Sequence, residues 1–318
     1  RFLCLCETSR PRRAECGSAA AMGEGLASYL GQSFYHSSIV PLLLLTLLLA
    51  WLARPSTSEA IPPGFRSFQI RYLAGWCLCV AADWLQGPYV YALYSAYGFS
   101  KHEIAQLFVA GFGASMLFGC FVGSLADQFG RKKSAIAYCI CYMLSCSATH
   151  VKSFWVLILG RIAGGIATSL LFSCFECWMV SEHLKNGFSG GLLSYMFSLM
   201  FTLMYVVAIL AGILAQSVAD TFDFHQVSEG SPFWVGGATT SFDASMVCLV
   251  AGALLITVFW GENYGTSPDS ENQGALQVLA SAGRLLAQDN RMWLMAVVVA
   301  SFEGSMFAFV FNWTPALA

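Results

Sequence analysis

The sequence predicts an all-α membrane protein that crosses the bilayer several times. Of its 318 residues, 57% are hydrophobic and only 11% are charged, whereas soluble globular chains carry about 25% charged residues. The mean hydropathy is +0.63. The apolar residues also gather in runs of about 20, the length that spans a bilayer as a helix. A chain with so few charges cannot cover a water-facing surface, and no basic stripe indicates nucleic-acid binding.

Eight apolar runs are long enough to be membrane helices. The first of them, "IVPLLLLTLLLAWLA", can also be interpreted as the apolar region of a signal peptide, although no clean cleavage site follows it. The expected helices cover 36–53, 71–97, 104–126, 134–150, 154–180, 190–219, 243–260 and 291–312.

The two ends of the chain differ from the rest. Residues 1–21 hold four arginines and no Met, and Met22 follows them, so we expect 1–21 to be a non-native leader. Residues 22–67 then form a leading transmembrane helix and its loop. At the other end, 291–318 stops just after an apolar run, which predicts a helix at the start of a truncated second half.

Lys and Arg are unequally divided between the two sets of connecting segments. Nine fall in one alternating set of loops, which includes 130–133, and two fall in the other set. Because cytoplasmic loops carry the excess of Lys and Arg, the loop 130–133 is predicted to be cytoplasmic. The polar segment 261–290 follows on the same side and is expected to be a linker, with a short amphipathic helix near 275–288.

Glycines four residues apart indicate close helix packing, because small residues let helix backbones approach each other in a membrane. This spacing occurs at Gly119 and Gly123 and again at Gly160 and Gly164. Both pairs therefore favour a packed bundle over independent membrane anchors.

The stretch "GSLADQFGRKKS" (123–134) combines these features in one tight turn. Gly123 is expected to let one helix approach a neighbour and Gly130 to allow the reversal. Asp127 can cap or pair near the helix ends, while Arg131 and Lys132 remain on the cytoplasmic side. The spacing G-x-x-x-D-x-x-G-R-K resembles the signature loop of the major facilitator superfamily. "GRIAGG" (160–165) resembles its second motif, without the glutamine often seen there.

Four further stretches resemble the molybdate-anion transporter family within that superfamily. They are "AADWLQGPYVYALY" (81–94), "LFSCFECWMVSEH" (171–183), "WGENY" (260–264) and "FEGSMFAFVFNWTP" (302–315). The resemblance covers roughly 68–318. It implies a major facilitator fold in which a leading helix precedes a six-helix half over 68–260, a cytoplasmic linker, and a second half that continues for about five more helices. It also implies uptake of molybdate by alternating access across the cell membrane.

Three ionisable residues fall deep inside separate apolar runs: Asp83, Arg161 and Glu303. Counting about 1.5 Å per residue places each about 18 Å from the inner surface. The resemblance implies that their helices line the central cavity, and substrates of such carriers bind near the midplane. We expect Arg161 to hold an oxyanion, because a guanidinium keeps its charge and donates to several oxygens. Asp83 and Glu303 are expected to pair with it or to carry a coupling proton. A purely structural ion network remains the alternative.

Other features predict less. Glu176 is expected to act in gating or in structure, together with Gly123, Asp127, Gly130, Arg131 and Lys132. Cys174 and Cys177 share a helical face, but packing is a simpler explanation than a metal or redox pair. No enzyme motif and no cofactor or metal site is found in the sequence. Two alternatives stay open: a carrier of another solute, such as a sugar or drug, and a truncated membrane protein that binds partners without transporting.

Overall fold

The computed structural model describes residues 34–52, 61–265 and 275–317. The expected leader 1–21 and the start at Met22 lie outside these residues. The chain divides into two units, residues 1–60 and residues 61–318. In the first unit, the predicted leading helix is observed as α2 (Phe34–Leu52), an apolar helix with Pro41 inside it.

The second unit is helical almost throughout, as predicted. Each expected helix is present, with ends that shift by a few residues, and the amphipathic helix of the linker is present too. Only the run 71–97 differs, because it forms two helices rather than one. The elements are α3 (Phe65–Gln86), α4 (Tyr89–Ala96), α5 (Lys101–Phe129), α6 (Arg131–Ala148), α7 (Phe154–Lys185), α8 (Gly190–Thr221), α9 (Thr239–Phe259), α10 (Ala275–Gln288), α11 (Asn290–Leu317), and the short strands β1 (His225–Gln226) and β2 (Trp234–Val235).

Local sequence explains where these helices begin and end. The break between α3 and α4 falls at Gly87 and Pro88, because proline has no backbone N–H to continue the helix. At the start of α5, Ser100 and Glu103 form a capping box: the Ser100 hydroxyl accepts from the Glu103 amide, and the Glu103 carboxylate accepts from the Ser100 amide. These signals set the end of α3 and the start of α5, two helices that carry residues of the candidate site described below.

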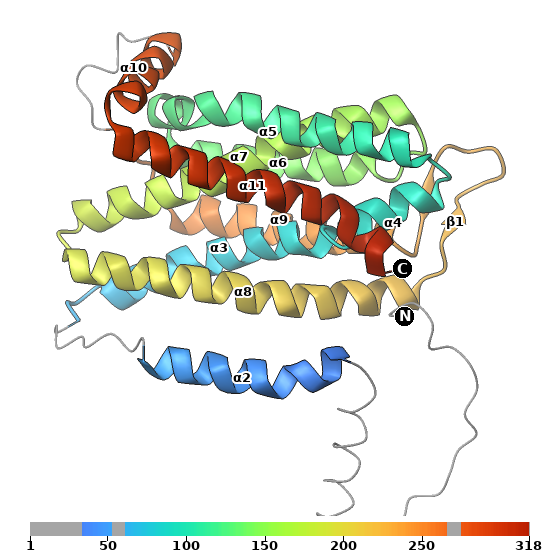
Figure 1. The fold of residues 1–318 in the computed structure, drawn as a ribbon, viewed down its shortest axis with the longest axis horizontal. Helices are drawn as coiled ribbons and strands as arrows, with labels where there is room; N and C mark the ends of the chain where they lie inside the picture. The colour runs from blue at the N-terminus through green and yellow to red at the C-terminus, as the bar shows by residue number, and fades with distance from the viewer. Residues whose placement is uncertain (1–33, 53–60, 266–274, 318) are drawn as a thin grey trace, which may run out of the picture. The chain divides into compact units, whose positions relative to one another are not determined.

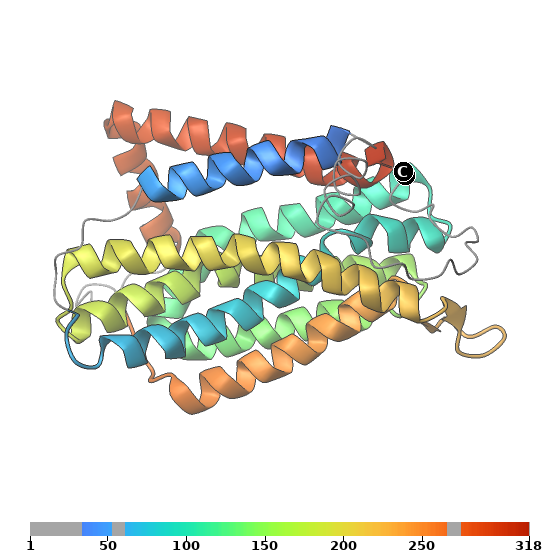
Figure 2. The ribbon, with the colours of Figure 1, turned by 90° about the horizontal axis from the view of Figure 1, so that it is seen from below.

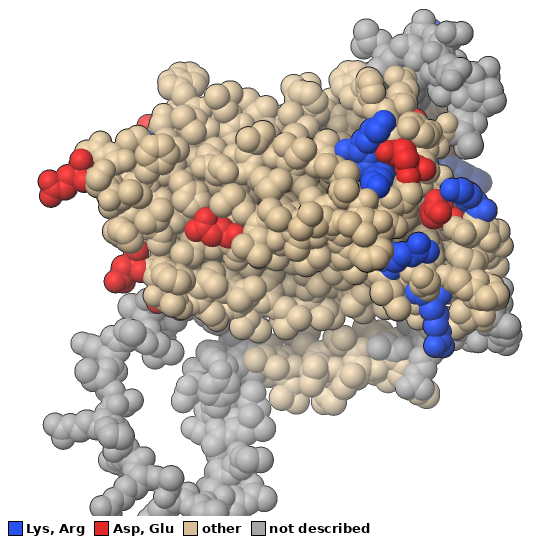
Figure 3. Space-filling model, turned by 180° about the vertical axis from the view of Figure 1, so that it is seen from behind, with Lys and Arg blue, Asp and Glu red and all other residues tan. Residues whose placement is uncertain are grey.

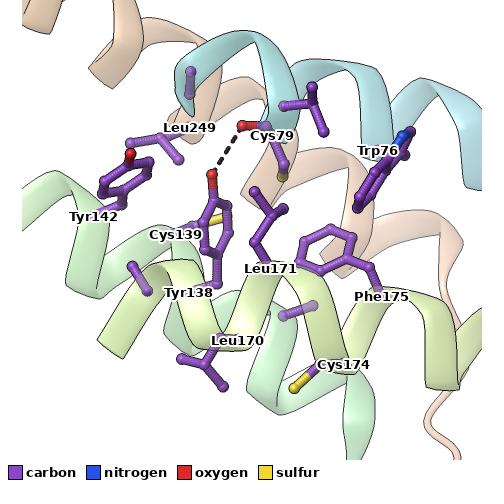
Figure 4. Packing of buried hydrophobic residues seen from close by; sticks show 14 of the residues in the cluster. Trp76, Cys79, Tyr138, Cys139, Tyr142, Leu170, Leu171, Cys174, Phe175 and Leu249 are labelled. Atoms are coloured by element: carbon purple, nitrogen blue, oxygen red, sulfur yellow. Dashed lines mark hydrogen bonds between the residues drawn. The ribbon is translucent and has the colours of Figure 1, made fainter. Parts of the chain in front are cut away.

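The helices pack as a bundle in which α7 lies against both α5 and α6, and α3 lies against α8 and α9 (Figures 1 and 2). α6 also contacts α9, so it joins the two groups. Figure 4 shows the core between α3, α6 and α7, where the Tyr138 hydroxyl donates to the carbonyl of Cys79 at 2.8 Å. Rings such as Trp76 and Phe175 fill the layer beside it.

The glycine pairs differ in their contacts. At Gly160, an added Cβ would lie 2.6 Å from the Cβ of Ala148, and at Gly164 it would lie 2.9 Å from the Oγ of Ser145, so the predicted close packing of α7 on α6 is confirmed. The same expectation is wrong for α5. A Cβ at Gly123 would meet nothing within 4 Å, and at Gly119 it would make an ordinary contact of 3.6 Å, because this stretch of α5 is largely exposed.

Five described helices are long and apolar enough to cross a membrane by themselves: α5, α7, α8, α9 and α11. α3 and α6 are more polar, and both lie where neighbouring helices cover many of their residues. Figure 3 shows Lys and Arg gathered toward one end of the bundle on this face, while the other end shows acidic side chains alone. This distribution fits the cytoplasmic assignment of the 130–133 loop.

Candidate functional site

Arg161 is a residue of α7, and its side chain packs against two residues of α5. Its guanidinium covers Gly111: a Cβ at Gly111 would lie 3.0 Å from Nη2 and 3.1 Å from Nε. The Cζ atom lies 5.5 Å from the centre of the Phe108 ring, a distance suited to a cation–π contact. The helices come this close because a Cβ at Gly165 would lie only 2.3 Å from the carbonyl oxygen of Gly111. Glycines of both helices therefore make room for the guanidinium.

One nitrogen of the Arg161 guanidinium lacks a hydrogen-bond partner. Arg161 Nε is buried and has no hydrogen-bond partner, and Arg161 forms no ion pair with any residue that the structure describes. Polar side chains nevertheless surround it. The narrow space beside it is lined by Gln86, Tyr94, Ser145 and Thr149 and is too tight to hold a water molecule. Arg161 as a whole is half-buried, and the Tyr94 hydroxyl interacts with its guanidinium, so the buried Nε is the donor without a partner. An ionisable residue inside a membrane bundle with an unsatisfied donor is a candidate for a functional role.

Asp83 lies near Arg161 but has another partner. The Tyr142 hydroxyl of α6 donates a hydrogen bond to Asp83 Oδ1. Arg161 is within electrostatic range of this carboxylate but outside ion-pair distance. The direct pairing of Asp83 with Arg161 that the sequence led us to expect is therefore not formed here, and Asp83 Oδ1 accepts from Tyr142 instead.

Glu303 lies on α11, which reaches the same region through aromatic rings. Phe307 stacks on Phe112 with 4.2 Å between ring centres, and Phe311 lies 5.4 Å from Phe108, the ring under Arg161. Glu303 is four residues before Phe307, so it shares this face of the helix about 6 Å nearer the inner side. Glu303 is exposed and has no ion pair with a described residue, so the structure brings Asp83 near Arg161 and shows no contact of Glu303 with either of them.

The loop at the inner end joins α5, α6 and α7. Arg131 donates from Nε to Asp127 Oδ1 at 2.8 Å, and its Nη2 lies 2.8 Å from the same oxygen. Its Nη1 donates to the carbonyl of Cys177 on α7 at 3.2 Å. Lys132 donates from Nζ to the carbonyl of Thr257 at the end of α9, at 2.8 Å. Three of the predicted gating residues thus tie the inner ends of four helices together.

A cavity of about 760 Å³ opens beside this loop. Arg131, Glu176 and Lys185 line it, together with Glu262 and Asn263 from the segment after α9. Glu176 is half-buried there and makes no ion pair with a described residue. No cluster of His, Cys, Asp or Glu that could hold a metal ion occurs in 34–52, 61–265 or 275–317.

Comparison with known proteins agrees with the motifs. A family described as sugar transporters with 12 transmembrane segments (MFS_5) matches residues 34–318. A molybdate-anion transporter of Xenopus tropicalis is 34% identical over 269 residues, which cover 83% of this chain and 56% of that protein. The molybdate-anion transporter of Takifugu rubripes is 31% identical over 89% of this chain and 61% of its own length. That of Danio rerio is 32% identical over 84% of this chain and 57% of its own length.

This chain belongs to the molybdate-anion transporter family of the major facilitator superfamily. It is accordingly an all-α, multi-pass membrane protein, as its composition predicted. The chain spans a little over half the length of the curated relatives it matches.

Several residues of these sites were not found from the sequence. Gly111 and Phe108 lie in an ordinary apolar run, and nothing in their spacing shows that they carry a cation. Tyr142 lies within the predicted membrane helix 134–150, and nothing in that run indicates that its hydroxyl contacts Asp83. Glu262 was noted only as part of a family-like stretch, yet it contacts the loop 130 residues earlier in the chain. One sequence signal does point to Glu262: it is an acidic residue in a segment predicted to lie on the same side of the membrane as Arg131, Lys132 and Lys133.

Proposed function

We propose that the protein moves molybdate or a related inorganic oxyanion across a membrane by alternating access, with Arg161 as the anion-binding charge. The observation that carries the proposal is the buried Nε of Arg161, which has no partner among the described residues. A guanidinium can donate two parallel hydrogen bonds to a tetrahedral oxyanion and keeps its charge at any physiological pH. The names of the relatives support the same class of substrate.

Phe108 and Gly111 set the orientation of the Arg161 guanidinium in this proposal. Gly111 allows the guanidinium of Arg161 to pack against the α5 backbone, and the Phe108 ring lies 5.5 Å from its Cζ atom. Neither residue supplies a hydrogen-bond acceptor from its side chain, and the buried Nε of Arg161 stays without a partner, while the Tyr94 hydroxyl interacts with the guanidinium. Because the space beside Arg161 is too tight for water in the state described, an oxyanion would enter only after the helices move apart. It would then gain the Nε donor without first breaking an ion pair, so less of the binding energy is lost in breaking existing contacts.

Asp83 provides the coupling in this proposal. An ionised Asp83 near Arg161 opposes the entry of a dianion, and a protonated one does not. Binding of the anion would then favour uptake of a proton by Asp83, with Tyr142 holding the carboxyl in place. Glu303 is on the same helix as Phe307 and Phe311, which contact α5, so in this proposal a movement of α11 during alternating access brings Glu303 to the site. The inner loop, with Asp127, Gly130, Arg131 and Lys132, closes the cytoplasmic side, and Gly123 and Glu176 flank it.

A carrier of a neutral solute is the second candidate, because the matching family is described as sugar transporters. The two can be separated by uptake into vesicles that contain the full-length protein. Accumulation of molybdate that tungstate and sulfate reduce and that sugars leave unchanged would support the oxyanion proposal. Sugar accumulation that molybdate does not affect would contradict it.

A further inference from the structure

The segment Trp260–Gly265, which we term the strap, follows α9 and crosses the inner ends of α5, α6 and α7. Two tryptophans anchor it: the rings of Trp178 and Trp260 stack with 4.0 Å between their centres. The indole of Trp178 donates to the carbonyl of Gly261 at 2.8 Å, and the side chain of Asn263 donates to the carbonyl of Trp178 at 3.2 Å. The strap is therefore held against α7 by stacking and by two hydrogen bonds.

α6 begins in a way that its own sequence does not stabilise. Gly130 occupies the cap position and has no side chain to accept from the first amides of the helix. Arg131, Lys132 and Lys133 fill the first turn, although the start of a helix carries partial positive charge and favours acidic residues. Without acceptors from elsewhere, the first N–H groups of α6 would lack partners.

The strap supplies these acceptors from far along the chain. Glu262 Oε1 accepts from the amide of Lys132 at 2.8 Å, and the carbonyl of Asn263 accepts from the amide of Arg131 at 3.0 Å. The carboxylate thus brings an acceptor and a negative charge to a helix start that has three cations. Hydrogen bonds to charged groups are among the stronger ones in proteins.

Gly130 leaves the space in which this carboxylate sits. A Cβ at Gly130 would lie 2.6 Å from Glu262 Cδ, and the backbone φ of +107° is one that side chains rarely adopt. The strap also covers Asp127, since the amide of Gly265 donates to its carbonyl at 3.1 Å. Half-buried Glu262 consequently lies against Gly130, the residue just before the Arg131 that pairs with Asp127.

We propose that Glu262 is a positioning residue of the inner gate. Its carboxylate fixes the start of α6 and thereby directs Arg131 toward Asp127 and the carbonyl of Cys177. Its importance for the transport cycle rests on the proposed function, whereas its effect on the inner gate does not. Removal of the carboxylate frees Arg131, and the wall of the cavity that Arg131 and Cys177 share becomes more open.

Labelling of Cys177 tests this directly, because its thiol is half-buried at this wall. The full-length protein in detergent is treated with a maleimide, and modification of Cys177 is followed by peptide mass spectrometry. We expect Glu262→Ala to raise the labelling rate about tenfold, the equivalent of one hydrogen bond to a charged group. Glu262→Gln should raise it less, because the amide keeps an acceptor. Tyr264→Phe, an exposed neighbour, should leave it unchanged.

Two outcomes overturn the proposal. Unchanged labelling in both Glu262→Ala and Glu262→Gln would show that the carboxylate does not hold the gate. An equal rise in Tyr264→Phe would show that any change in the strap has the same effect. Uptake measured alongside should fall in maximal rate, with KM unchanged, in Glu262→Gln. If the unsubstituted protein shows no uptake, the proposed function fails, and the labelling result still decides the role of Glu262.

Discussion

The guanidinium of Arg161 rests directly on Gly111, so that any side chain added at Gly111 would meet Nη2 at 3.0 Å and Nε at 3.1 Å. This contact joins α7 to α5 at a point where both helices are deep in the bundle. It also means that the orientation of the Arg161 side chain depends on a residue that has no side chain of its own. The contact can be disturbed without removing the charge.

Substitution of Gly111 should therefore weaken binding of the anion. We expect Gly111→Ala to raise the KM for molybdate several-fold, because a contact near 3.0 Å forces the guanidinium to shift by a few tenths of an ångström. A bulkier Gly111→Val should raise it further. Gly113→Ala, at an open position on the same helix, is the matched control and should behave as the unsubstituted protein. Equal effects at both glycines would argue against the contact.

Gly165 should matter for stability rather than for binding alone. A Cβ there would lie 2.3 Å from the carbonyl of Gly111 and 2.9 Å from the amide of Ser115, and backbone atoms cannot move aside cheaply. We expect Gly165→Ala to destabilise the packing of α5 on α7 by roughly 1–3 kcal/mol. Thermal unfolding in detergent measures this. Gly212→Ala on α8, where the added Cβ meets nothing, should be neutral or slightly stabilising.

The outer end of the bundle contains a pair that should respond to pH. His150 Nε2 lies 3.0 Å from Asp243 Oδ1, and this hydrogen bond raises the pKa of His150 above its usual value, against the opposing effect of burial. A raised folded-state pKa stabilises the fold fully below the unfolded pKa of about 6.5, and this stability is lost as pH rises through the folded value. We expect the melting temperature to fall with rising pH across this window, and His150→Gln to remove that part of the dependence. An identical pH profile in both proteins would contradict the pairing.

Asp83 should determine how uptake depends on pH. In the unsubstituted protein, we expect uptake of molybdate to rise as the outside becomes more acidic, because protonation of Asp83 removes the charge that opposes the anion. Asp83→Asn mimics the protonated state, so it should allow anion exchange and abolish the pH dependence. Tyr142→Phe keeps the carboxyl and should retain the dependence with a shifted midpoint. A pH profile that Asp83→Asn leaves unchanged would exclude this residue as the proton carrier.

Much of the fold could be predicted from local sequence, because each membrane helix is a separate apolar run and each turn has its own polar or glycine signal. The depth of Asp83 and Arg161 also followed from counting residues along single helices. The contacts that define the sites did not follow. Glu262 meets Lys132 across 130 residues, and Gly111 meets Arg161 across 50, so no local pattern records them.

The errors have the same origin. Gly123 and Gly164 have the same kind of spacing partner, yet only Gly164 meets a neighbouring helix closely. Spacing shows that a close approach is sterically allowed, and the neighbour decides whether it happens. Asp83 was expected to face Arg161 because opposite charges at one depth attract, but the hydroxyl of Tyr142 provides the nearer partner.

The central claim is that the Arg161 charge binds the oxyanion, and equilibrium binding of molybdate to the purified full-length protein tests it most directly. Arg161→Ala and Arg161→Lys are compared with Arg284→Ala, an exposed arginine of α10. We predict that Arg161→Ala abolishes saturable binding, that Arg161→Lys weakens it at least about tenfold because the planar pair of donors is lost, and that Arg284→Ala binds normally. Unchanged affinity in a folded Arg161→Ala protein would contradict the account.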